Sequence, residues 1–559
     1  MKTIDGFEIL PYLPPPFPDD SWLSLDVEIF GLKKGRFHKP EGVFASLALT
    51  NDGQKAYVLT DVKDLKDYFQ HLLHDSDCGA VLQNASFDIF HLRRWMDFPV
   101  RKRFWDTMLC DRILWGGYYE DYSLKGLTRR YLKAHMEKDV RSDFEKATEL
   151  TDEMIYYNAV DAVATWRIAQ EQMKLYKKSH KKVWEEIDAP AMWAFLEFKG
   201  PMIDVEKWEG IAEKNEAIAD GIAQEFGFNP RSPKQVKEYL SSIGIKVEST
   251  GAEDLERHKS NEVVAKILEY RGVQKLASTY GKSWITKHIE EDGRVKTSYD
   301  VNRAESGRTS SSEPNLQNIP IRKSPAFREC FIAAPGNVLI CGDYSQQEVR
   351  GMAYLSQDEN LIEIFKSGRD VYSEVASYIY KEPITKEDER RQKTKSLVLG
   401  IIYGLTPFGL VRELGCSEEE AEELFSMFFA RFSKVRAWMD KQQAKVDTYV
   451  RTAAGRKCWL NPYSSQAQRN ACNSPSQGSA ADMLKRAIAN LYESWDREVE
   501  LFPAVLQVHD EILIEVKAEN EQYAIQTLEE SMLIAGEYVI PNVPVAVEVK
   551  SGASWAQVH

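Results

Sequence analysis

Two acidic positions that lie far apart in the chain have the residue types needed to bind divalent cations. Near the C-terminus, in AVLQVHDEILIEV, two apolar runs of β-type residues are separated by His509, Asp510 and Glu511. This pattern predicts a hairpin with a polar apex. Adjacent carboxylates repel each other and gain no burial at an apex, and a bound divalent cation is the usual reason for such a pair. Far upstream, the apolar strand expected over residues 338–341 ends next to Asp343, the second candidate ligand.

A helix expected between these positions carries a stripe of cationic and apolar groups. In RQKTKSLVLGIIYG, every fourth residue belongs to the set Arg391, Lys395, Leu399 and Tyr403. The segment has good helix formers and no proline, so these side chains share one helix face about 18 Å long. Cations at one end and apolar and aromatic groups at the other suit a nucleoside triphosphate. The alternative is a surface helix with a basic first half, although basic residues early in a helix oppose its macrodipole and favour an external anion.

A third group of acidic residues lies in the first third of the chain. Asp26 and Glu28 are two apart on a predicted strand, so their side chains leave the same face, although such pairs also occur on solvated strands. Asp88 follows the point where a strand gives way to a helix, and Tyr157 and Asp161 lie one helical turn apart. Together the four carboxylates can hold two metal ions, with the tyrosine orienting a water for attack on a phosphodiester.

The chain has the length and composition of a multidomain globular protein. Two to four domains are expected for 559 residues, of which 43% are hydrophobic and 28% charged. Strand-like and helix-like patterns alternate to about residue 167, as in an α/β domain, and Lys-Gly-Pro at 199–201 marks a boundary. Helical patterns dominate residues 205–285 and 355–460, and strand patterns return from about residue 500.

The net charge, the N-terminal sequence and the cysteine spacing indicate which partners, locations and metal sites to expect. The net charge of −14 does not exclude a nucleic-acid partner, because phosphate contact depends on where Lys and Arg cluster. No apolar run reaches membrane-spanning length, and the N-terminus lacks the regions of a signal peptide. The seven cysteines include no CxxC pair, which argues against a zinc site or a disulfide framework. We therefore expect a protein of the bacterial or infected-host cytoplasm without a membrane partner.

The order of the N-terminal motifs, D-x-E, N-x-x-x-D and Y-x-x-x-D, resembles that of the DEDD-type 3′–5′ exonucleases. The tyrosine four residues before the last aspartate is similar to that of the DEDDy branch, and the resemblance covers residues 22–165. It implies an α/β, RNase H-like domain that degrades a single-stranded DNA 3′ end. The implied metal ligands are Asp26, Glu28, Asp88 and Asp161, with Tyr157 as a catalytic residue.

The C-terminal motifs resemble those of family A DNA polymerases. DYSQQEVR, RQKTKSLVLGIIYG and QVHDE are similar to motifs A, B and C of this family, and SGRTSSSEPNLQNIP, QRNACNSPSQGSAAD and the ending WAQVH add to the match. The resemblance spans nearly the whole chain from Asp26 to His559 and implies an α+β right-hand polymerase. The expected boundaries are 1–185 for the exonuclease domain and 186–559 for the polymerase domain, with the thumb at about 203–290, the fingers at about 351–464, and the palm at about 186–202, 291–350 and 465–559.

The resemblance implies roles for the matching residues. Asp343 and Asp510, with the Tyr344 carbonyl, would hold two Mg²⁺ ions, for which Mn²⁺ can substitute, and Glu511 would support the site. Lys395 is the candidate general acid for pyrophosphate. The implied nucleotide-binding residues are Arg391, Lys395, Leu399, Tyr403, Glu348, Gln346 and Tyr372. The implied contacts to primer–template DNA are Arg308, Asn318, Arg469, Asn473, Gln477, His509, Lys275, Tyr280 and Arg456.

Two of these implied roles concern selectivity. Glu348 and Tyr403 would exclude a ribose 2′-OH by a clash, which selects deoxynucleotides. The DNA contacts would reach minor-groove acceptors and phosphates. Because these groups vary little with DNA sequence, such contacts suit an enzyme that must accept every correct base pair.

The chain departs from the family pattern at four positions. Leu399 stands where Phe or Tyr is usual, as in some phage-encoded members, and it lacks the hydroxyl that a tyrosine would supply, so we expect poor use of dideoxynucleotides. Val398 replaces the usual Asn, and Gln347 the usual Ile. Tyr372 replaces a triphosphate-contacting His and can donate a hydrogen bond but carries no charge. The short segment before Asp26 leads us to expect no 5′ nuclease.

We expect a DNA-templated DNA polymerase with proofreading that acts in replication or repair, as a monomer, on primer–template DNA and dNTPs. A processivity factor could dock on the helices of 205–285. Two alternatives are a nuclease whose C-terminal half only binds DNA and a non-catalytic DNA-binding protein. The first should lack one of the metal or phosphate residues, and none is missing; the second leaves the site residues in both halves unexplained.

Overall fold

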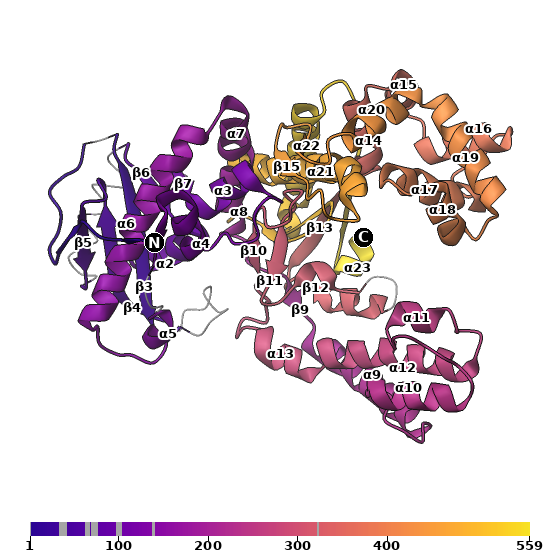
Figure 1. Ribbon diagram of the computed structural model, residues 1–559, viewed down its shortest axis with the longest axis horizontal. Helices are drawn as coiled ribbons and strands as arrows, with labels where there is room; N and C mark the ends of the chain where they lie inside the picture. The colour runs from indigo at the N-terminus through magenta and orange to yellow at the C-terminus, as the bar shows by residue number, and fades with distance from the viewer. Residues whose placement is uncertain are drawn as a thin grey trace.

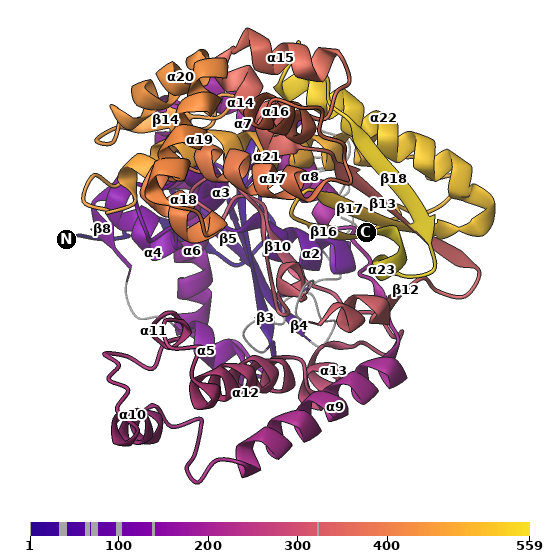
Figure 2. The same cartoon turned by 90° about the vertical axis from the view of Figure 1, so that its right-hand side faces the viewer.

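The computed structural model describes residues 2–18, 20–32, 42–61, 68, 77–96, 103–136, 140–320 and 324–559. Figure 1 shows an N-terminal unit with its own sheet, a second sheet near the middle of the molecule, and two groups of helices that project from that middle. The turned view in Figure 2 places the helices of residues 205–288 below the second sheet and those of residues 359–443 at the top and upper left of the picture. The predicted combination of an α/β unit with an α+β unit is therefore confirmed.

The N-terminal unit is built on a six-stranded mixed sheet. Its strands are β2 (Glu8–Leu10), β3 (Trp22–Phe30), β4 (Val43–Thr50), β5 (Lys55–Leu59), β6 (Gly79–Leu82) and β7 (Phe104–Asp106), in the spatial order β2-β5-β4-β3-β6-β7. In β3, the apolar residues at 23, 25, 27 and 29 are buried and alternate with Asp26 and Glu28, which are partly exposed. Because side chains alternate along a strand, both carboxylates leave the same face, as predicted.

Helices pack against this sheet. They are α2 (Ala85–Met96), α3 (Thr107–Trp115), α4 (Leu124–Leu127), the π-helical turn η2 (Thr128–Leu132), α5 (Arg141–Phe144) and α6 (Asp152–Leu175), and β1 (Lys2–Thr3) pairs with β8 (Ala134–His135). The long helix α6 packs on β3, β4 and β5. Its start is capped by Thr151, whose hydroxyl accepts the Met154 N–H at 3.2 Å. This packing brings Tyr157 and Asp161 to the sheet.

An antiparallel four-stranded sheet forms the middle of the molecule. Its strands are β13 (Asn337–Tyr344), β16 (Ala504–Val508), β17 (Glu511–Lys517) and β18 (Val547–Gly552), in the order β16-β17-β13-β18. The long helices α21 (Ala467–Ser494) and α22 (Glu521–Val539) pack together, and α22 also covers β13 and β18. The predicted hairpin is the β16–β17 pair, in which Val508 faces Glu511 across a two-residue turn.

Smaller elements complete the middle unit and its junction with the N-terminal one. They are α7 (Lys178–Val183), η3 (Trp184–Asp188), α8 (Ala189–Phe195), β9 (Met202–Ile203), β10 (Ser298–Asp300), β11 (Ser310–Ser312), η4 (Leu316–Asn318), η5 (Pro325–Cys330), β12 (Phe331–Ile332), α14 (Gln347–Ser356), β14 (Tyr449–Arg451), β15 (Lys457–Trp459), η6 (Ala518–Asn520) and α23 (Trp555–Val558). One buried apolar cluster runs from β3 to α21 and α22, so the two units share a core.

The two projecting groups consist of helices only. The first group contains α9 (Val205–Gln224), α10 (Pro233–Ser242), α11 (Ala252–Glu256), α12 (Glu262–Thr279) and α13 (Lys282–His288). The second contains α15 (Glu359–Lys366), α16 (Val371–Tyr380), α17 (Glu389–Ile402), α18 (Pro407–Leu414), α19 (Glu418–Arg431) and α20 (Ser433–Gln443). They coincide with the segments expected to be thumb and fingers, whose exact boundaries stay predictions. Over the described ranges, no helix has both the length and the apolar composition to span a membrane.

A buried ion cluster attaches η3, at the junction of the two units, to the middle unit. Asp188, at the end of η3, accepts bonds from Arg456 at 2.6 and 2.9 Å and from the Lys485 ammonium at 2.6 Å. Asp482 accepts a further bond from the Arg456 guanidinium at 2.8 Å. All four side chains are at most 3% exposed. This corrects the expectation that Arg456 contacts DNA, since its guanidinium is buried and fully engaged with carboxylates.

We expect the substitution Asp188→Asn to lower the free energy of unfolding by about 3–5 kcal/mol, because it leaves two buried cations with one carboxylate. Urea denaturation monitored by circular dichroism measures the change. The control is Asp220→Asn, on the exposed face of α9, which should match the wild type. An unchanged free energy for the Asp188 variant would contradict this account of the junction.

Candidate active sites

Three carboxylates of the N-terminal unit converge as predicted. Asp26 and Glu28 on β3 and Asp161 on α6 each offer an oxygen, and these oxygens lie within 4.8 Å of one another. They line a cleft of about 840 Å³ that also contains Asp88 and Tyr157. Carboxylate oxygens at this spacing are suited to hold divalent cations.

Asp88 lies beside the other three carboxylates but is held differently. It belongs to the first turn of α2 and is 3% exposed, and its Oδ1 accepts the Val27 N–H at 3.0 Å. Burial and the nearby Asp26 charge raise its pKa well above the usual value. One of its oxygens is thus engaged by the backbone of β3.

Without a bound cation, burial and mutual repulsion destabilise the ionised carboxylates of this cleft. Burial raises the pKa of Asp26 to about 6, although the Asn158 amide donates to its carboxylate at 2.6 Å. Burial, followed by the charges of Asp26 and Asp161, raises the pKa of Glu28, and the Arg141 guanidinium opposes this. Asn158 and Arg141 were not predicted; Asn158 is recognisable only because it adjoins Tyr157 in α6, and the sequence around Arg141 holds no signal.

The Tyr157 phenol lines the same cleft. Burial, and then the charges of Asp161 and Glu28, raise its pKa far above the usual value. The phenol therefore stays protonated at physiological pH and can donate a hydrogen bond. The predicted role, orienting a water for attack, requires such a donor.

A second acidic site lies at the end of the middle sheet. Asp343, near the end of β13, is directly opposite Glu511 of β17, and Asp510 is the adjoining turn residue. Paired antiparallel residues have Cα atoms about 5 Å apart, so the two aspartates are close neighbours. Burial, and then the charges of Asp510, Glu511 and Glu548, raise the pKa of Asp343 to about 8.

Glu511 is buried beside this acidic site, so the expectation that the acidic pair gains no burial is wrong for it. It is 5% exposed, and its carboxylate accepts a bond from the Trp555 indole at 3.0 Å and lies 2.7 Å from a His559 ring nitrogen. Burial alone would raise its pKa, but these partners and Arg328 lower it below the usual value. Glu511 thus anchors the C-terminal helix α23 beneath the hairpin, which suits a supporting residue.

Glu548 is an acidic neighbour that sequence reasoning missed. On β18 it is directly opposite Asp343, and its charge contributes to the raised pKa of that aspartate. The alternation VAVEVK does indicate that Glu548 and Lys550 share one face of a strand. It does not indicate that this strand, β18, pairs with β13.

The raised pKa of Asp343 makes the stability of the metal-free protein depend on pH. The unfolded carboxyl titrates near 3.8 and the folded one near 8, so this group stabilises the fold at low pH and loses that contribution as pH rises between those values. In EDTA, we expect the unfolding free energy of the wild type to decrease from about pH 6 to pH 8 more steeply than that of Asp343→Asn. The difference between the two slopes should be up to about 1.4 kcal/mol per pH unit. The exposed control Asp447→Asn should follow wild type. Parallel profiles for wild type and Asp343→Asn would contradict the raised pKa.

The predicted stripe on α17 is present. Its four residues, Arg391, Lys395, Leu399 and Tyr403, are each partly exposed, whereas Leu397 and Val398 beside them are buried. The departure at Val398 is therefore a core residue, 1% exposed. The departure at Gln347 is also buried, with its amide donating to the Ala480 carbonyl at 3.2 Å.

The cationic end of the stripe is held by α16. Asp370 caps α16 and accepts two bonds from Arg391, at 2.9 and 2.8 Å, and one from Gln346 at 2.8 Å. The Tyr372 ring, 4% exposed, lies 5.4 Å from the Arg391 guanidinium and 5.8 Å from the Lys395 ammonium. Asp370 was not predicted; its signal is an N-cap position, which is common to many helices.

Glu348 lies where α14 faces the end of α17. It accepts a bond from the Tyr403 hydroxyl and forms an ion pair with Arg308 at 2.9 Å. The glutamate is thus held by two partners from distant segments, next to the apolar end of the stripe. This arrangement gives the predicted pair, Glu348 and Tyr403, a fixed geometry.

The remaining residues predicted to contact DNA differ in how far their side chains are exposed. Arg469, Asn473 and Gln477 lie four residues apart on α21 and share one face with partial or full exposure. The exposed members of the other candidates are His509, Asn318, Lys275 and Arg308. Tyr280 is 8% exposed, and its hydroxyl donates to the Asn318 carbonyl at 2.7 Å, so it positions Asn318.

Two family models match this chain in comparisons with known proteins. Residues 205–557 match the family model for DNA polymerase family A, and residues 20–176 match that for 3′–5′ exonuclease. The chain is 31% identical to DNA polymerase I of Lactococcus lactis subsp. cremoris over 82% of this chain and 55% of that protein. It is also 31% identical to DNA polymerase I of Pseudomonas aeruginosa over 100% of this chain and 64% of that protein. The chain thus spans less than two thirds of the length of these relatives.

A solved structure is similar over nearly its whole length. The polymerase domain of Pol1 from M. smegmatis, in complex with a DNA primer-template and dNTP, superimposes with a TM-score of 0.81 and 26% identity, covering 96% of each chain. These matches confirm the predicted pairing of an exonuclease domain with a polymerase domain. Since the polymerase family model matches well over half of its residues, this chain belongs to DNA polymerase family A.

Proposed function

We propose that the protein is a DNA-templated DNA polymerase that adds deoxynucleotides to a primer 3′-OH and corrects errors with a 3′–5′ exonuclease. The observation that carries this proposal is the presence of two separate carboxylate sites, one of which adjoins a helix with a cationic end. The similar M. smegmatis domain, whose structure contains primer-template DNA and dNTP, supports the same partners here. Replication and repair both require this activity.

The donor set of the synthetic site fits divalent cations. The carboxylates of Asp343 and Asp510 and the carbonyl of Tyr344 are hard oxygen donors. The raised pKa of Asp343 reflects burial first and then repulsion from neighbouring carboxylates, which a cation relieves. Two Mg²⁺ ions, or Mn²⁺ in their place, would lower the pKa of the primer hydroxyl and stabilise the charge of the departing pyrophosphate. The protein's part is to place these donors at the end of a rigid sheet.

The residues of α17 bind the incoming triphosphate. Arg391 and Lys395 bind its phosphates from the cationic end of the stripe, with the ring of Tyr372 behind them. The Lys395 ammonium can donate a proton to the pyrophosphate as it leaves. At the other end, Glu348 and Tyr403 close off the space that a ribose 2′-OH would need.

The DNA contacts are independent of sequence. Arg469, Asn473 and Gln477 on α21 reach minor-groove atoms and phosphates of the template and primer, and Lys275 binds the duplex from α12. Arg308 belongs to the same set, and its ion pair with Glu348 connects the primer end to the sugar-selecting residues.

In the N-terminal cleft, Asp26, Glu28, Asp161 and the neighbouring Asp88 would hold the same cations. Tyr157, protonated and hydrogen-bonding, orients the attacking water toward the last phosphodiester of a single-stranded 3′ end. The cleft takes a few nucleotides of single strand at its volume of about 840 Å³.

Leu399 belongs to the triphosphate stripe and has no hydroxyl that could replace the missing sugar 3′-OH of a dideoxynucleotide. We therefore expect Leu399→Tyr to increase incorporation of dideoxynucleotides relative to deoxynucleotides by about tenfold or more. Single-nucleotide incorporation with matched ddNTP and dNTP concentrations measures the ratio. Leu399→Met, of similar size and without a hydroxyl, should leave it low. Efficient chain termination by wild type at dNTP-like ddNTP concentrations would contradict this reading of Leu399.

Primer extension by the wild-type protein tests the proposed function. With Mg²⁺, dNTPs and a paired primer, we expect full-length product, and with a mispaired 3′ nucleotide we expect its removal before extension. A protein that removes nucleotides but never extends would support the alternative of a nuclease with a DNA-binding C-terminal half. Neither activity would support a non-catalytic DNA-binding protein.

A further inference from the structure

A run of lysines lies where the N-terminal unit meets the middle unit. The segment KLYKKSHKK leads into α7, and Lys177, Lys178 and Lys181 are exposed there. In contrast to Lys174, which is paired with Glu171 at 2.6 Å, these three lysines form no ion pair with any residue in the described ranges. A lysine run by itself is usually a solvated surface, so its role depends on what folds against it.

The β14–β15 hairpin adds two further cations to this surface. Its residues alternate between buried and partly exposed positions, and Arg451 and Lys457 are directly paired across the outward face. Like the lysines of α7, neither has an ion pair within the part of the chain that the structure describes. The hairpin turn contacts α7, because a Cβ on Gly455, whose φ is +95°, would lie 3.8 Å from the Ser179 Cβ. Two segments that are far apart in the chain thus bring their cations together.

These cations act on the same titratable groups. Burial, followed by the charges of three cations, lowers the pKa of His180 to about 4, and the three are Lys457, Arg451 and Lys177. The hydrogen bond from Arg451, and then the charges of the same cations, lower the pKa of Tyr449. Like charges directly opposite each other on a sheet are destabilising. The free protein therefore carries a repulsion here that a bound anion relieves.

The aromatic rings of this surface are engaged by neighbouring groups. The Tyr449 ring centroid lies 5.1 Å from the Arg451 guanidinium and 4.7 Å from the Lys457 ammonium. Trp459 stacks on Trp115, with ring centroids 5.3 Å apart, and meets the Tyr449 ring edge-on. Proteins that bind single-stranded nucleic acids combine cations with open ring faces. The engaged rings favour a ligand that offers charges rather than bases.

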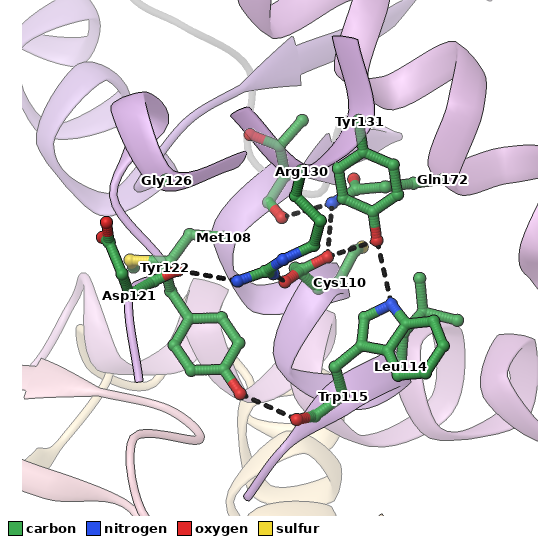
Figure 3. Close-up of polar contacts among 12 residues, drawn as sticks. Met108, Cys110, Leu114, Trp115, Asp121, Tyr122, Gly126, Arg130, Tyr131 and Gln172 are labelled. Carbon is green, nitrogen blue, oxygen red and sulfur yellow. Dashed lines mark hydrogen bonds and ion pairs between the residues drawn. The ribbon is translucent and has the colours of Figure 1, made fainter. Parts of the chain in front are cut away.

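The hairpin is fixed to the N-terminal unit through Trp459. The Trp459 indole donates to the Leu114 carbonyl at 2.8 Å. Figure 3 shows how the neighbouring Trp115 is held: its indole donates to the Tyr131 hydroxyl at 3.0 Å, and its carbonyl accepts a bond from the Tyr122 hydroxyl at 2.8 Å. A surface held in this way loses little entropy when it binds a ligand.

The charge balance of the chain makes this surface distinctive. The protein has 86 acidic residues against 72 basic ones, so an acidic ligand is attracted only where cations concentrate. The residues proposed to bind the triphosphate and the duplex lie mainly on α17, α21 and α12, and none of them belongs to this surface. The cations of α7 and of the hairpin therefore suit a different anionic partner.

We propose that a basic patch, formed by Lys177, Lys178, Lys181, Arg451 and Lys457, is a docking site for an acidic, extended peptide segment of a partner protein. Successive carboxylates of the segment bind the cations contributed by α7 and by the hairpin. The basic patch contains no residue of either carboxylate site, so a docked partner need not displace substrate.

The test measures binding of a fluorescein-labelled peptide of alternating aspartate and glycine to the full-length protein by fluorescence anisotropy. At low salt we expect the wild type to bind it at least about tenfold more tightly than a peptide of alternating asparagine and glycine of equal length, and to release it as salt is added. Lys177→Glu/Lys457→Glu should raise the Kd for the acidic peptide by about tenfold or more, because each reversal replaces an attraction with a repulsion. Lys178→Glu/Lys181→Glu, which changes only exposed residues of α7, should act in the same direction.

Matched variants separate loss of charge from loss of folding, which circular dichroism detects. Lys55→Glu/Lys146→Glu reverses two exposed lysines outside the basic patch and should keep the wild-type Kd. Lys177→Arg/Lys457→Arg keeps both charges and should also bind the peptide.

Equal binding of the acidic and neutral peptides by the wild type would overturn the inference, as would an unchanged Kd for both charge-reversed variants of the basic patch. If these variants instead lose affinity for a labelled oligothymidylate that the control variant still binds, the basic patch is a nucleic-acid site and the peptide assignment is wrong.

Discussion

Asp510→Asn is expected to abolish primer extension, with a loss of about 10³-fold or more in nucleotide incorporation, while single-stranded DNA is still degraded at the wild-type rate. The reason is that Asp510 adjoins Asp343 at the end of the middle sheet, and in the synthetic site that we propose both charges bind cations beside the primer end. An amide keeps the size of the side chain but removes its charge. Single-nucleotide incorporation and a single-strand degradation assay on the same preparation measure both activities.

The position of Asp510 allows a loss of activity to be separated from a loss of folding. It lies in a two-residue turn and is partly exposed, so the substitution does not disturb the core. Asp447→Asn, an exposed aspartate of the same half, is the control and should retain both activities. Extension by Asp510→Asn at the wild-type rate would contradict the assignment of the synthetic site, and loss of both activities would point to misfolding, which circular dichroism detects.

The reverse pattern is expected for Asp26→Ala. Exonuclease activity should fall by about 10³-fold or more, because one of the three converging carboxylates is lost, while primer extension stays at the wild-type rate. Extension from a mispaired primer should then proceed without prior removal of the mispair. Excision of a labelled, mispaired 3′ nucleotide measures the loss directly.

The fold should tolerate this change. Burial raises the pKa of Asp26 to about 6, so its ionised form is disfavoured without a cation, and its removal relieves repulsion with Glu28. Asp20→Ala, an exposed aspartate of the same unit, is the matched control. Removal of the mispaired nucleotide by Asp26→Ala at the normal rate would show that the N-terminal carboxylates are assigned wrongly.

Local patterns in the sequence were sufficient to predict the elements that carry the site residues. Alternation in β3 determined that Asp26 and Glu28 share a face, and the four-residue spacing in α17 determined that Arg391 and Tyr403 share a stripe. The apolar runs around Asp510 determined the β16–β17 hairpin. These predictions hold because the direction of a side chain follows from strand and helix periodicity, which is a property of a few neighbouring residues.

Only the tertiary structure decided which charged groups are free to act. Arg456 is neutralised by Asp188 from 268 positions away, while Arg303 lines the cleft of the other unit. Glu511, next to Asp510, turns into the core because Trp555 and His559 pack behind the hairpin. The physical reason is that burial and pairing of a charge depend on the segments that fold against it. Those contacts join residues far apart in the chain, and no local pattern encodes them.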